Sequence, residues 1–275
     1  MIRNFSIIFG LSLLIFITTP EVLWTQSGNG KEKNSQTSPV SESLKNEQLR
    51  QKLEQAHRII YMMGLAEDST RGHITAKSDD GLYYIKPWGT AFEKVTAKEM
   101  QGLDIEGNLV DGRGRVHSEK YLHLEIYRAR KDVGAIVHVH PFYSIILSTL
   151  FDGKLSTIAQ QSVPFTGKIP IFVSPELIQT KELGQAVAKT LGDAPLLLMK
   201  NHGITVVGKT LEEAVVLAIH FEQAAKYHLY AHKFGKPSEM SHEDAQKLYK
   251  NNYRPDQIKM QWDFWLDRYN ELKVK

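Results

Sequence analysis

Two histidines separated by a single residue, His138 and His140, end the stretch Ala135–His140, whose β-branched residues are typical of a strand. Side chains two apart on a strand project from the same face, so these imidazoles stand side by side, as two ligands of a metal ion must. His202 follows an apolar run and precedes Gly203, and it offers a third imidazole at a turn. We predict a three-histidine metal site; histidines that bind no metal are the alternative.

A carboxylate beside such a site could act as a general base or as a further ligand, and Glu119 is the candidate. Glu119 follows His117 and Ser118 in a loop that enters a predicted helix. In the alternative interpretation Ser118 caps this helix, and Glu119 is a favourable charge at its N-terminus.

Two glycine-containing turns between strand-like segments, Gly72-His73 and Trp88-Gly89, could present backbone amides to an anionic substrate, or could be ordinary turns. A second metal site on three histidines of one helix is less favoured, because no HExxH pattern accompanies them; they are His220, His228 and His232. No dinucleotide-binding, P-loop or G-x-S-x-G pattern occurs.

The composition narrows the partners and the metal ligands. The chain of 275 residues has a net charge of +3 and no basic stripe interleaved with aromatic residues, so we expect no nucleic-acid partner. It contains no cysteine, so a transition metal must be held mainly by His, Asp or Glu.

An apolar stretch from Phe5 to Thr19 follows a weakly basic start. It is short for a membrane span but suits a signal-peptide core, so residues 1–24 are predicted to be a signal peptide or a retained membrane anchor. Residues 25–43 read as a flexible polar linker, and residues 44–275 as the folded domain. The predicted location is therefore exported or membrane-anchored, with a cytoplasmic protein as the alternative.

Periodicity along residues 44–275 alternates between helical and strand-like. Helices are expected at 44–65, 118–130, 177–191, 210–233 and within 249–269, with a capping box at Thr210. Strands are expected at 73–76, 82–85, 135–140 and 196–199, with a hairpin at 104–114. This order indicates one α/β domain with a mixed or largely antiparallel sheet.

Taken in order, five motifs resemble the class II aldolase/adducin family over about residues 48–235: Gly72-His73-Ile74-Thr75-Ala76, Lys86-Pro87-Trp88-Gly89, Ser118-Glu119, His138-Val139-His140-Pro141 and Asn201-His202-Gly203. The resemblance implies a three-layer α/β/α fold with a central, mainly antiparallel sheet, assembled as a homotetramer. It also implies Zn²⁺ on the three histidines, with Glu119 at the acid/base position. Fe²⁺ or Mn²⁺ is compatible with the same ligands.

The resemblance also places substrate contacts at Gly72, His73, Trp88, Gly89, His117 and Ser118, where sugar-phosphate aldolases bind phosphate. This chain has His73 where those enzymes usually have Asn, Trp88 where they have Thr, and His117 where they have a small hydroxyl residue. We therefore expect a metal-dependent aldolase-like lyase for a small hydroxy-carbonyl or sugar-derived compound, and these differences disfavour a sugar phosphate.

Three alternatives remain. The same site could carry out epimerisation, dehydration or decarboxylation, or Fe²⁺ redox chemistry. The Gly72-His73 and Lys86–Gly89 forms also resemble the adducin-like branch, so a non-catalytic interaction module is a further hypothesis.

Overall fold

The computed structural model describes residues 39–150 and 152–273, with side chains from residue 43 to residue 272. The helices are α1 (Pro39–Met62), α2 (Lys120–Ala129), α3 (Phe142–Leu150), α4 (Lys181–Leu191), α5 (Leu211–Phe234), α6 (His242–Asn252) and α7 (Pro255–Lys273), with short 3₁₀ helices η1 (Ala97–Glu99) and η2 (Gln160–Phe165). The strands are β1 (His73–Lys77), β2 (Tyr83–Ile85), β3 (Gln101–Leu103), β4 (Leu109–Asp111), β5 (Ala135–Val139), β6 (Ile171–Phe172), β7 (Leu196–Met199) and β8 (Gly203–Gly208).

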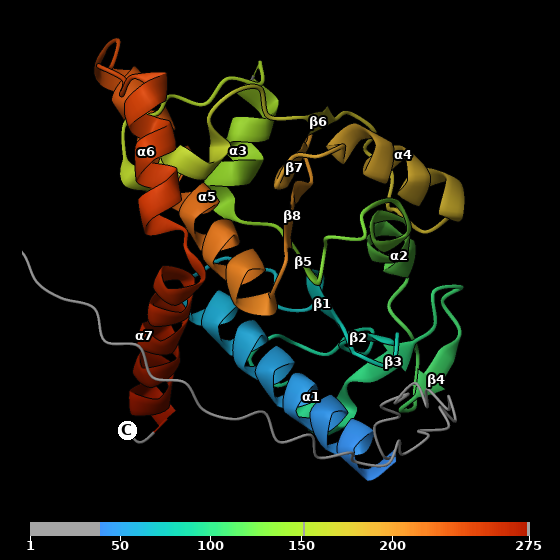
Figure 1. The fold of residues 1–275 in the computed structure, drawn as a ribbon. Helices are drawn as coiled ribbons and strands as arrows, with labels where there is room; N and C mark the ends of the chain where they lie inside the picture. Colours follow the sequence, from blue (N-terminus) through green and yellow to red (C-terminus); the bar gives the residue numbers. More distant parts are fainter. Residues whose placement is uncertain (1–38, 151, 274–275) are drawn as a thin grey trace, which may run out of the picture. The chain divides into compact units, whose positions relative to one another are not determined.

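The eight described strands form one sheet in the order β4-β3-β2-β1-β5-β8-β7-β6. Every neighbouring pair is antiparallel except β6 and β7, which are parallel. Figure 1 shows α2 and α4 on one side of this sheet and α1 and α5 on the other. The expected three-layer α/β/α fold with a mainly antiparallel sheet is confirmed.

The two faces of β5 explain why its whole sequence is buried. Val137 and Val139 enter the larger core, beneath α1, α3, α5 and α7, whereas Ile136 enters the core beneath α2 and α4. Because side chains alternate along a strand, His138 shares the face of Ile136. The metal-binding candidate therefore points towards the α2 side of the sheet.

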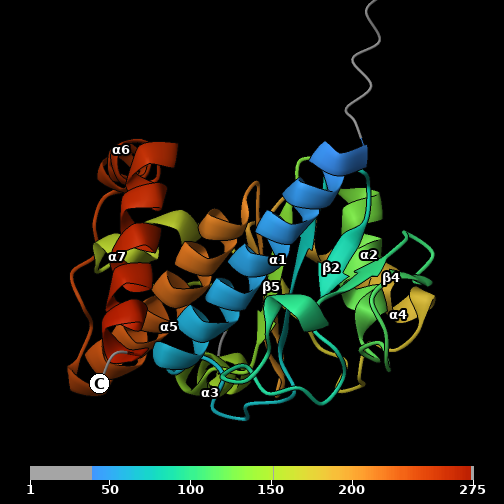
Figure 2. The ribbon, with the colours of Figure 1, turned by 90° about the horizontal axis from the view of Figure 1, so that it is seen from below.

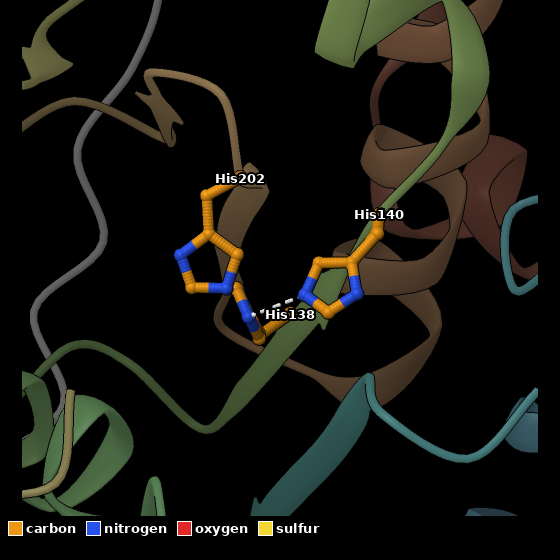
Figure 3. Close-up of side chains that lie close together, drawn as sticks. All are labelled: His138, His140 and His202. Atoms are coloured by element: carbon orange, nitrogen blue, oxygen red, sulfur yellow. Dashed lines mark hydrogen bonds between the residues drawn. The ribbon is translucent and has the colours of Figure 1, made fainter. Parts of the chain in front are cut away.

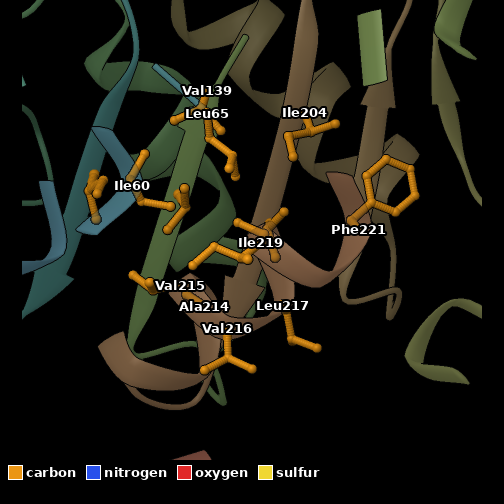
Figure 4. Close-up of a cluster of buried hydrophobic side chains, with 14 of the residues drawn as sticks. Ile60, Leu65, Val139, Ile204, Ala214, Val215, Val216, Leu217, Ile219 and Phe221 are labelled. Atoms are coloured by element: carbon orange, nitrogen blue, oxygen red, sulfur yellow. The ribbon is translucent and has the colours of Figure 1, made fainter. Parts of the chain in front are cut away.

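The first part of helix α5, Leu211–Phe221, is mostly apolar and is covered on almost all sides. Its residues Leu211–Phe221 are nearly all buried, and Figure 4 shows Val215 and Ile219 among side chains from the sheet and from α1. Figure 2 shows α1 and α7 flanking α5. Burying one such aliphatic side chain contributes about 1.5–3 kcal/mol, so α5 is a rigid support behind the sheet.

The helix starts follow their capping residues. The Thr210 hydroxyl accepts a hydrogen bond from Glu213 N, as a capping box requires, but the Glu213 carboxylate accepts from Lys209 N rather than from Thr210 N. The predicted start of α4 at residue 177 is wrong: Thr180 caps the helix, which begins at Lys181. Residues 177–179 stay outside it.

Other predicted boundaries differ as well. Helix α1 begins at Pro39, before the predicted residue 44, and the 249–269 stretch is split because Pro255 begins a new helix. Helix α3 and strand β8 were not expected. Within the part of the chain that the structure describes, no helix has the length and apolar character to cross a membrane. The predicted signal or anchor and residues 25–38 of the predicted linker lie outside it.

Candidate metal centre

A row of polar side chains crosses the sheet at its centre. His138 on β5 is directly opposite His73 on β1 and Thr205 on β8. Directly opposite residues in antiparallel strands project from the same face, so all three side chains point towards α2. All three are fully buried. The register of the sheet therefore places two imidazoles and a hydroxyl together.

The three predicted histidines converge where β5 ends and the chain turns from β7 into β8. Each pair of their rings has centroids 4.9 Å apart. Nε2 of His138 lies 3.1 Å from Nε2 of His140, and one ligand atom from each of the three lies within 4.8 Å of the others. Figure 3 shows the rings of His138, His140 and His202 facing one space. Such an arrangement could hold a metal ion.

The other ring nitrogens decide which atoms are available. His138 Nδ1 lies 3.0 Å from the carbonyl oxygen of Ile204, and His140 Nδ1 is hydrogen-bonded to the carboxylate of Asp68. In both rings Nδ1–H donates, so Nε2 keeps a lone pair that points into the site. Histidines that bind metals usually donate their second nitrogen in this way. The donor chemistry therefore fits a divalent transition metal.

His138 and His202 are held in the neutral form that metal binding needs. Burial lowers the pKa of His138 well below its usual value, and the neighbouring histidines lower it further. Burial, assisted by His140, lowers the pKa of His202 to about 4. At neutral pH these two side chains therefore offer lone pairs rather than charges.

A strained turn carries His202 into the site. Asn201 has a left-handed conformation with φ of 59°, and its backbone N–H donates to the Ser148 hydroxyl at 2.9 Å. A Cβ at Gly203 would lie 2.3 Å from the Val139 carbonyl oxygen, so only glycine fits there. The sequence Asn201-His202-Gly203 thus brings this turn against the end of β5.

The segment after His140 is held by a buried carboxylate on α5. Glu222 accepts hydrogen bonds from the backbone N–H groups of Tyr143 and Ser144, at 2.8 and 2.9 Å. These are N–H groups of the first turn of α3, which have no partner within the helix. Glu222 therefore fixes the direction in which the chain leaves His140.

Glu119 faces the three histidines from the start of α2. Its Oε1 accepts a hydrogen bond from Ile178 N at 2.9 Å, and its Oε2 lies 3.5 Å from Nε2 of His73. Burial raises the pKa of Glu119. Glu119, and not Ser118, is the N-cap residue of α2, and its side chain makes no cap hydrogen bond, so the alternative in which Ser118 caps this helix is wrong. The loop before α4, which was predicted to be helical, supplies its backbone partner.

A pocket of about 920 Å³ opens onto the site. Seven predicted residues line it: Trp88, Gly89, His117, Ser118, Glu119, His140 and His202. Burial lowers the pKa of His117 to about 3. Two cations, Arg71 and Arg115, also line the pocket, and the Arg115 guanidinium lies 4.1 Å from the centre of the Trp88 ring.

The two remaining residues of the predicted substrate side lie elsewhere. Gly72 packs against β5, where a Cβ would lie 2.9 Å from the His138 carbonyl oxygen. The His73 side chain is fully buried, and neither residue lines the pocket. The position of His73 favours a contact with Glu119 rather than with a substrate.

The structure does not support a second metal site on α5. The rings of His228 and His232 are tilted against each other with centroids 4.4 Å apart, but they contact Ser156, whose N–H donates to His228 Nδ1. His220 bonds to the Tyr253 hydroxyl. Among the side chains that the structure describes, two groups could hold a metal ion, and both contain His138.

Besides Arg71 and Arg115, three residues that support the site were not found from the sequence. Asp68 supports His140, and His123 and Tyr127 extend the polar contacts of His73 into the interior. His123 and Tyr127 stand four apart on α2 and so share one face of that helix. This four-residue spacing was the one sequence signal for His123 and Tyr127, and no sequence pattern pointed to Asp68.

Comparison with known proteins defines the class. The family model described as the class II aldolase and adducin N-terminal domain matches residues 51–229. The chain belongs to the class II aldolase and adducin family, and the resemblance seen in its five motifs is confirmed.

Relatives within this family differ in their reactions. Decarboxylase NovR of Streptomyces niveus is 31% identical over 188 residues, covering 66% of this chain and 69% of NovR. An L-fuculose phosphate aldolase of Methanocaldococcus jannaschii is 31% identical over 155 residues, covering 56% of this chain and 82% of that protein. The L-fuculose 1-phosphate aldolase of Glaciozyma antarctica PI12 has a similar fold, with a TM-score of 0.74 and 23% identity over 86% of this chain and 94% of that structure.

Proposed function

We propose that this protein is a metal-dependent lyase that breaks a carbon–carbon bond next to a carbonyl group in a small, unphosphorylated hydroxy-carbonyl compound. The observation that carries the proposal is the convergence of three imidazoles, two of them held by Nδ1 hydrogen bonds, beside a buried carboxylate. The two relatives named as an aldolase and a decarboxylase support it, because both of those reactions break a carbon–carbon bond.

In this proposal His138, His140 and His202 hold the ion. A divalent metal in that position would supply a Lewis acid that polarises a carbonyl oxygen. Zn²⁺ is the expected ion because it accepts three histidines with an open position, although the ligand set also suits Fe²⁺ or Mn²⁺.

Glu119 is assigned the role of general base. Its Oε1 is fixed by Ile178 N, while its Oε2 remains on the side of the histidines. Because burial raises its pKa towards neutrality, Glu119 can accept a proton from a substrate hydroxyl and return it later.

The pocket favours an anionic substrate with an apolar part. Arg71 and Arg115 bring two guanidinium groups that form no ion pair with a described residue. Trp88, with 48% of its surface exposed, and Phe142 bring aromatic surface. Indole and imidazole side chains replace the small donors that bind phosphate in the sugar-phosphate aldolases, so the acidic group is assigned as a carboxylate. Decarboxylation is the second candidate reaction, since NovR is named a decarboxylase.

Metal analysis of the full-length protein tests the proposal. The purified chain should contain about one Zn²⁺, which the double variant His138→Ala/His140→Ala should lose. The matched control is His228→Ala/His232→Ala, which removes a histidine pair outside the site and should keep the metal. The metal-loaded protein is then assayed with hydroxy-carbonyl compounds, with and without a carboxylate or phosphate. A folded wild-type protein without metal would favour the non-catalytic module instead.

We also propose, from the apolar stretch Phe5–Thr19, that the protein is exported or anchored through residues 1–24. From the family resemblance we propose that it assembles as a homotetramer. N-terminal sequencing of the protein from membrane and soluble fractions tests the first statement. Light scattering on the purified protein tests the second.

A further inference from the structure

A chain of five buried polar side chains leads from the metal centre into the space between β1 and α2. Starting from the interior, the Tyr127 hydroxyl lies 2.9 Å from Thr75 Oγ1, which lies 2.8 Å from His123 Nδ1. His123 Nε2 lies 2.5 Å from His73 Nδ1, and His73 Nε2 faces Glu119 Oε2 at 3.5 Å. All five residues are buried, so each hydrogen must be placed within the chain itself.

The interior end decides the direction of the hydrogen bonds. Burial raises the pKa of Tyr127 well above its usual value, so the phenol keeps its hydrogen. Thr75 Oγ1 is the one group that the described contacts offer to this hydrogen, so Tyr127 donates to Thr75. The Thr75 hydroxyl then has its own hydrogen free to donate to His123 Nδ1.

The same direction continues through both imidazoles. Burial lowers the pKa of His123 to about 3, so the ring is neutral and carries one hydrogen. Because Nδ1 accepts from Thr75, this hydrogen is on Nε2 and is donated to His73 Nδ1. A neutral His73 that accepts at Nδ1 carries its hydrogen on Nε2. That N–H points at Glu119.

We propose that His73 is a positioning residue that presents Nε2–H to Glu119, and that His123, Thr75 and Tyr127 fix it in this tautomer. A second group of side chains also lies close enough together to hold a metal ion, namely His73, Glu119 and His138. The direction of the hydrogen bonds excludes His73 as a ligand, because a nitrogen that carries hydrogen has no lone pair to give. The ion therefore belongs with His138, His140 and His202.

This arrangement gives the base a specific partner. Nε2 of His73 makes no hydrogen bond to a described residue, and its N–H faces Glu119 Oε2 at 3.5 Å. This distance is long for a hydrogen bond, so the contact acts mainly through the attraction between the N–H dipole of the neutral ring and the carboxylate. An N–H that points at Oε2 favours the charged carboxylate and so lowers the pKa of Glu119, whereas burial raises it.

The tautomer of His73 can be measured directly in the metal-free full-length protein. Long-range ¹H–¹⁵N correlation spectra of histidine-labelled protein separate Nε2–H from Nδ1–H rings, and a His73→Gln variant assigns the signals. We expect His73 and His123 both to be Nε2–H tautomers, and His73 to stay so after Zn²⁺ is added. An Nδ1–H signal for His73, or a zinc-induced shift of its Nε2, would overturn the proposal.

Two substitutions at His123 test its positioning role. The amide nitrogen of Gln can take the place of Nε2 and donate to His73, whereas Leu cannot donate. His123→Gln should keep the His73 tautomer and a kcat within about threefold of wild type, and His123→Leu should lose the tautomer and lower kcat about tenfold or more, with KM and zinc content little changed. Equal kcat values for the two folded variants would contradict the proposal.

The kinetic comparison rests on the proposed function, but the tautomer measurement needs neither metal nor turnover. A wrong assignment of His73 can therefore be told apart from a wrong assignment of the reaction. If His123→Leu does not fold, the wild-type tautomer still decides.

Discussion

His140 donates its Nδ1 hydrogen to the carboxylate of Asp68, a residue 72 positions earlier in the chain. The contact joins the end of β5 to the loop between α1 and β1, and it leaves Nε2 of His140 as the free nitrogen. Asp68 Oδ1 is buried and has no hydrogen-bond partner among the described residues. The carboxylate is thus committed to one task, which is to orient this imidazole.

Replacing Asp68 should weaken metal binding without unfolding the protein. In Asp68→Ala the ring of His140 loses the acceptor that fixes its tautomer, and such outer partners typically contribute 10–100-fold to affinity. We expect the dissociation constant for Zn²⁺ to rise by about that factor in competition titrations with a chelator. Asp263→Ala removes an exposed carboxylate that pairs with Lys259, and serves as the control. Equal zinc affinities for the two variants would contradict the role of Asp68.

Two glycine substitutions should separate damage to the site from damage to the fold. Gly203→Ala drives a Cβ into the Val139 carbonyl oxygen at 2.3 Å, and Gly134→Ala drives one into the Lys209 carbonyl oxygen at 2.2 Å, at the other end of β5. Both should lower the free energy of unfolding by about 1–3 kcal/mol or more, as overpacking does. Thermal melts measure this loss.

Zinc titration of the same two variants provides the contrast. Only Gly203→Ala displaces the turn that carries His202, so only this variant should also lose zinc. Retention of zinc by a folded Gly203→Ala protein would show that His202 is not needed.

Removing the charge of Glu119 should affect turnover more than metal content. Loss of a general base typically lowers kcat about 10²–10⁴-fold, and we expect this range for Glu119→Gln with a zinc content close to one per chain. The matched control is Glu125→Gln, which alters another buried carboxylate of α2, one that pairs with Arg128. If Glu119→Gln lost its zinc as well, the carboxylate would be assigned as a fourth ligand.

The metal-free protein should lose stability in acid, beginning near pH 6.5. Burial lowers the pKa of His57, His117 and His123 to about 3 each, below the value of 6.5 in an unfolded chain. Between pH 6.5 and about pH 3 the unfolded state binds more protons than the folded state, so the free energy of unfolding falls as the pH falls. Above pH 6.5 this loss is absent.

Each histidine contributes up to about 1.4 kcal/mol per pH unit in this window. Urea unfolding at a series of pH values, with a chelator present, measures the slope. A free energy of unfolding that stays constant from pH 7 to pH 5 would contradict the prediction.

The residues that were predicted correctly are those whose placement depends on local geometry. Alternation along β5 was enough to pair His138 with His140, and Gly203 was enough to place His202 in a turn. The order of the motifs then identified the family and so the three layers. Helix α3 escaped prediction because its sequence, FYSIILSTL, does not show which face is buried: Ser144 and Ser148 are buried, whereas Phe142 and Leu150 are exposed.

The contacts that were missed depend on tertiary structure. The burial of His73 follows from the pairing of β1 with β5, which no single segment encodes. The bond from Ile178 N to Glu119 exists because residues 177–179 stay out of α4. By contrast, the break between α6 and α7 was signalled by Pro255, since proline favours the first turn of a new helix.

The pairing of β5 with both of its neighbours has a consequence for folding. A slip of this strand by a single residue would exchange its two faces, turning Val139 towards α2 and hiding His138 beneath α5. A chain misaligned in this way would still be hydrophobic enough to collapse, but it would have no donor set. Metal uptake would therefore report that the central strands are aligned correctly, and the ion would serve as a check on the folded chain before it takes part in any chemistry.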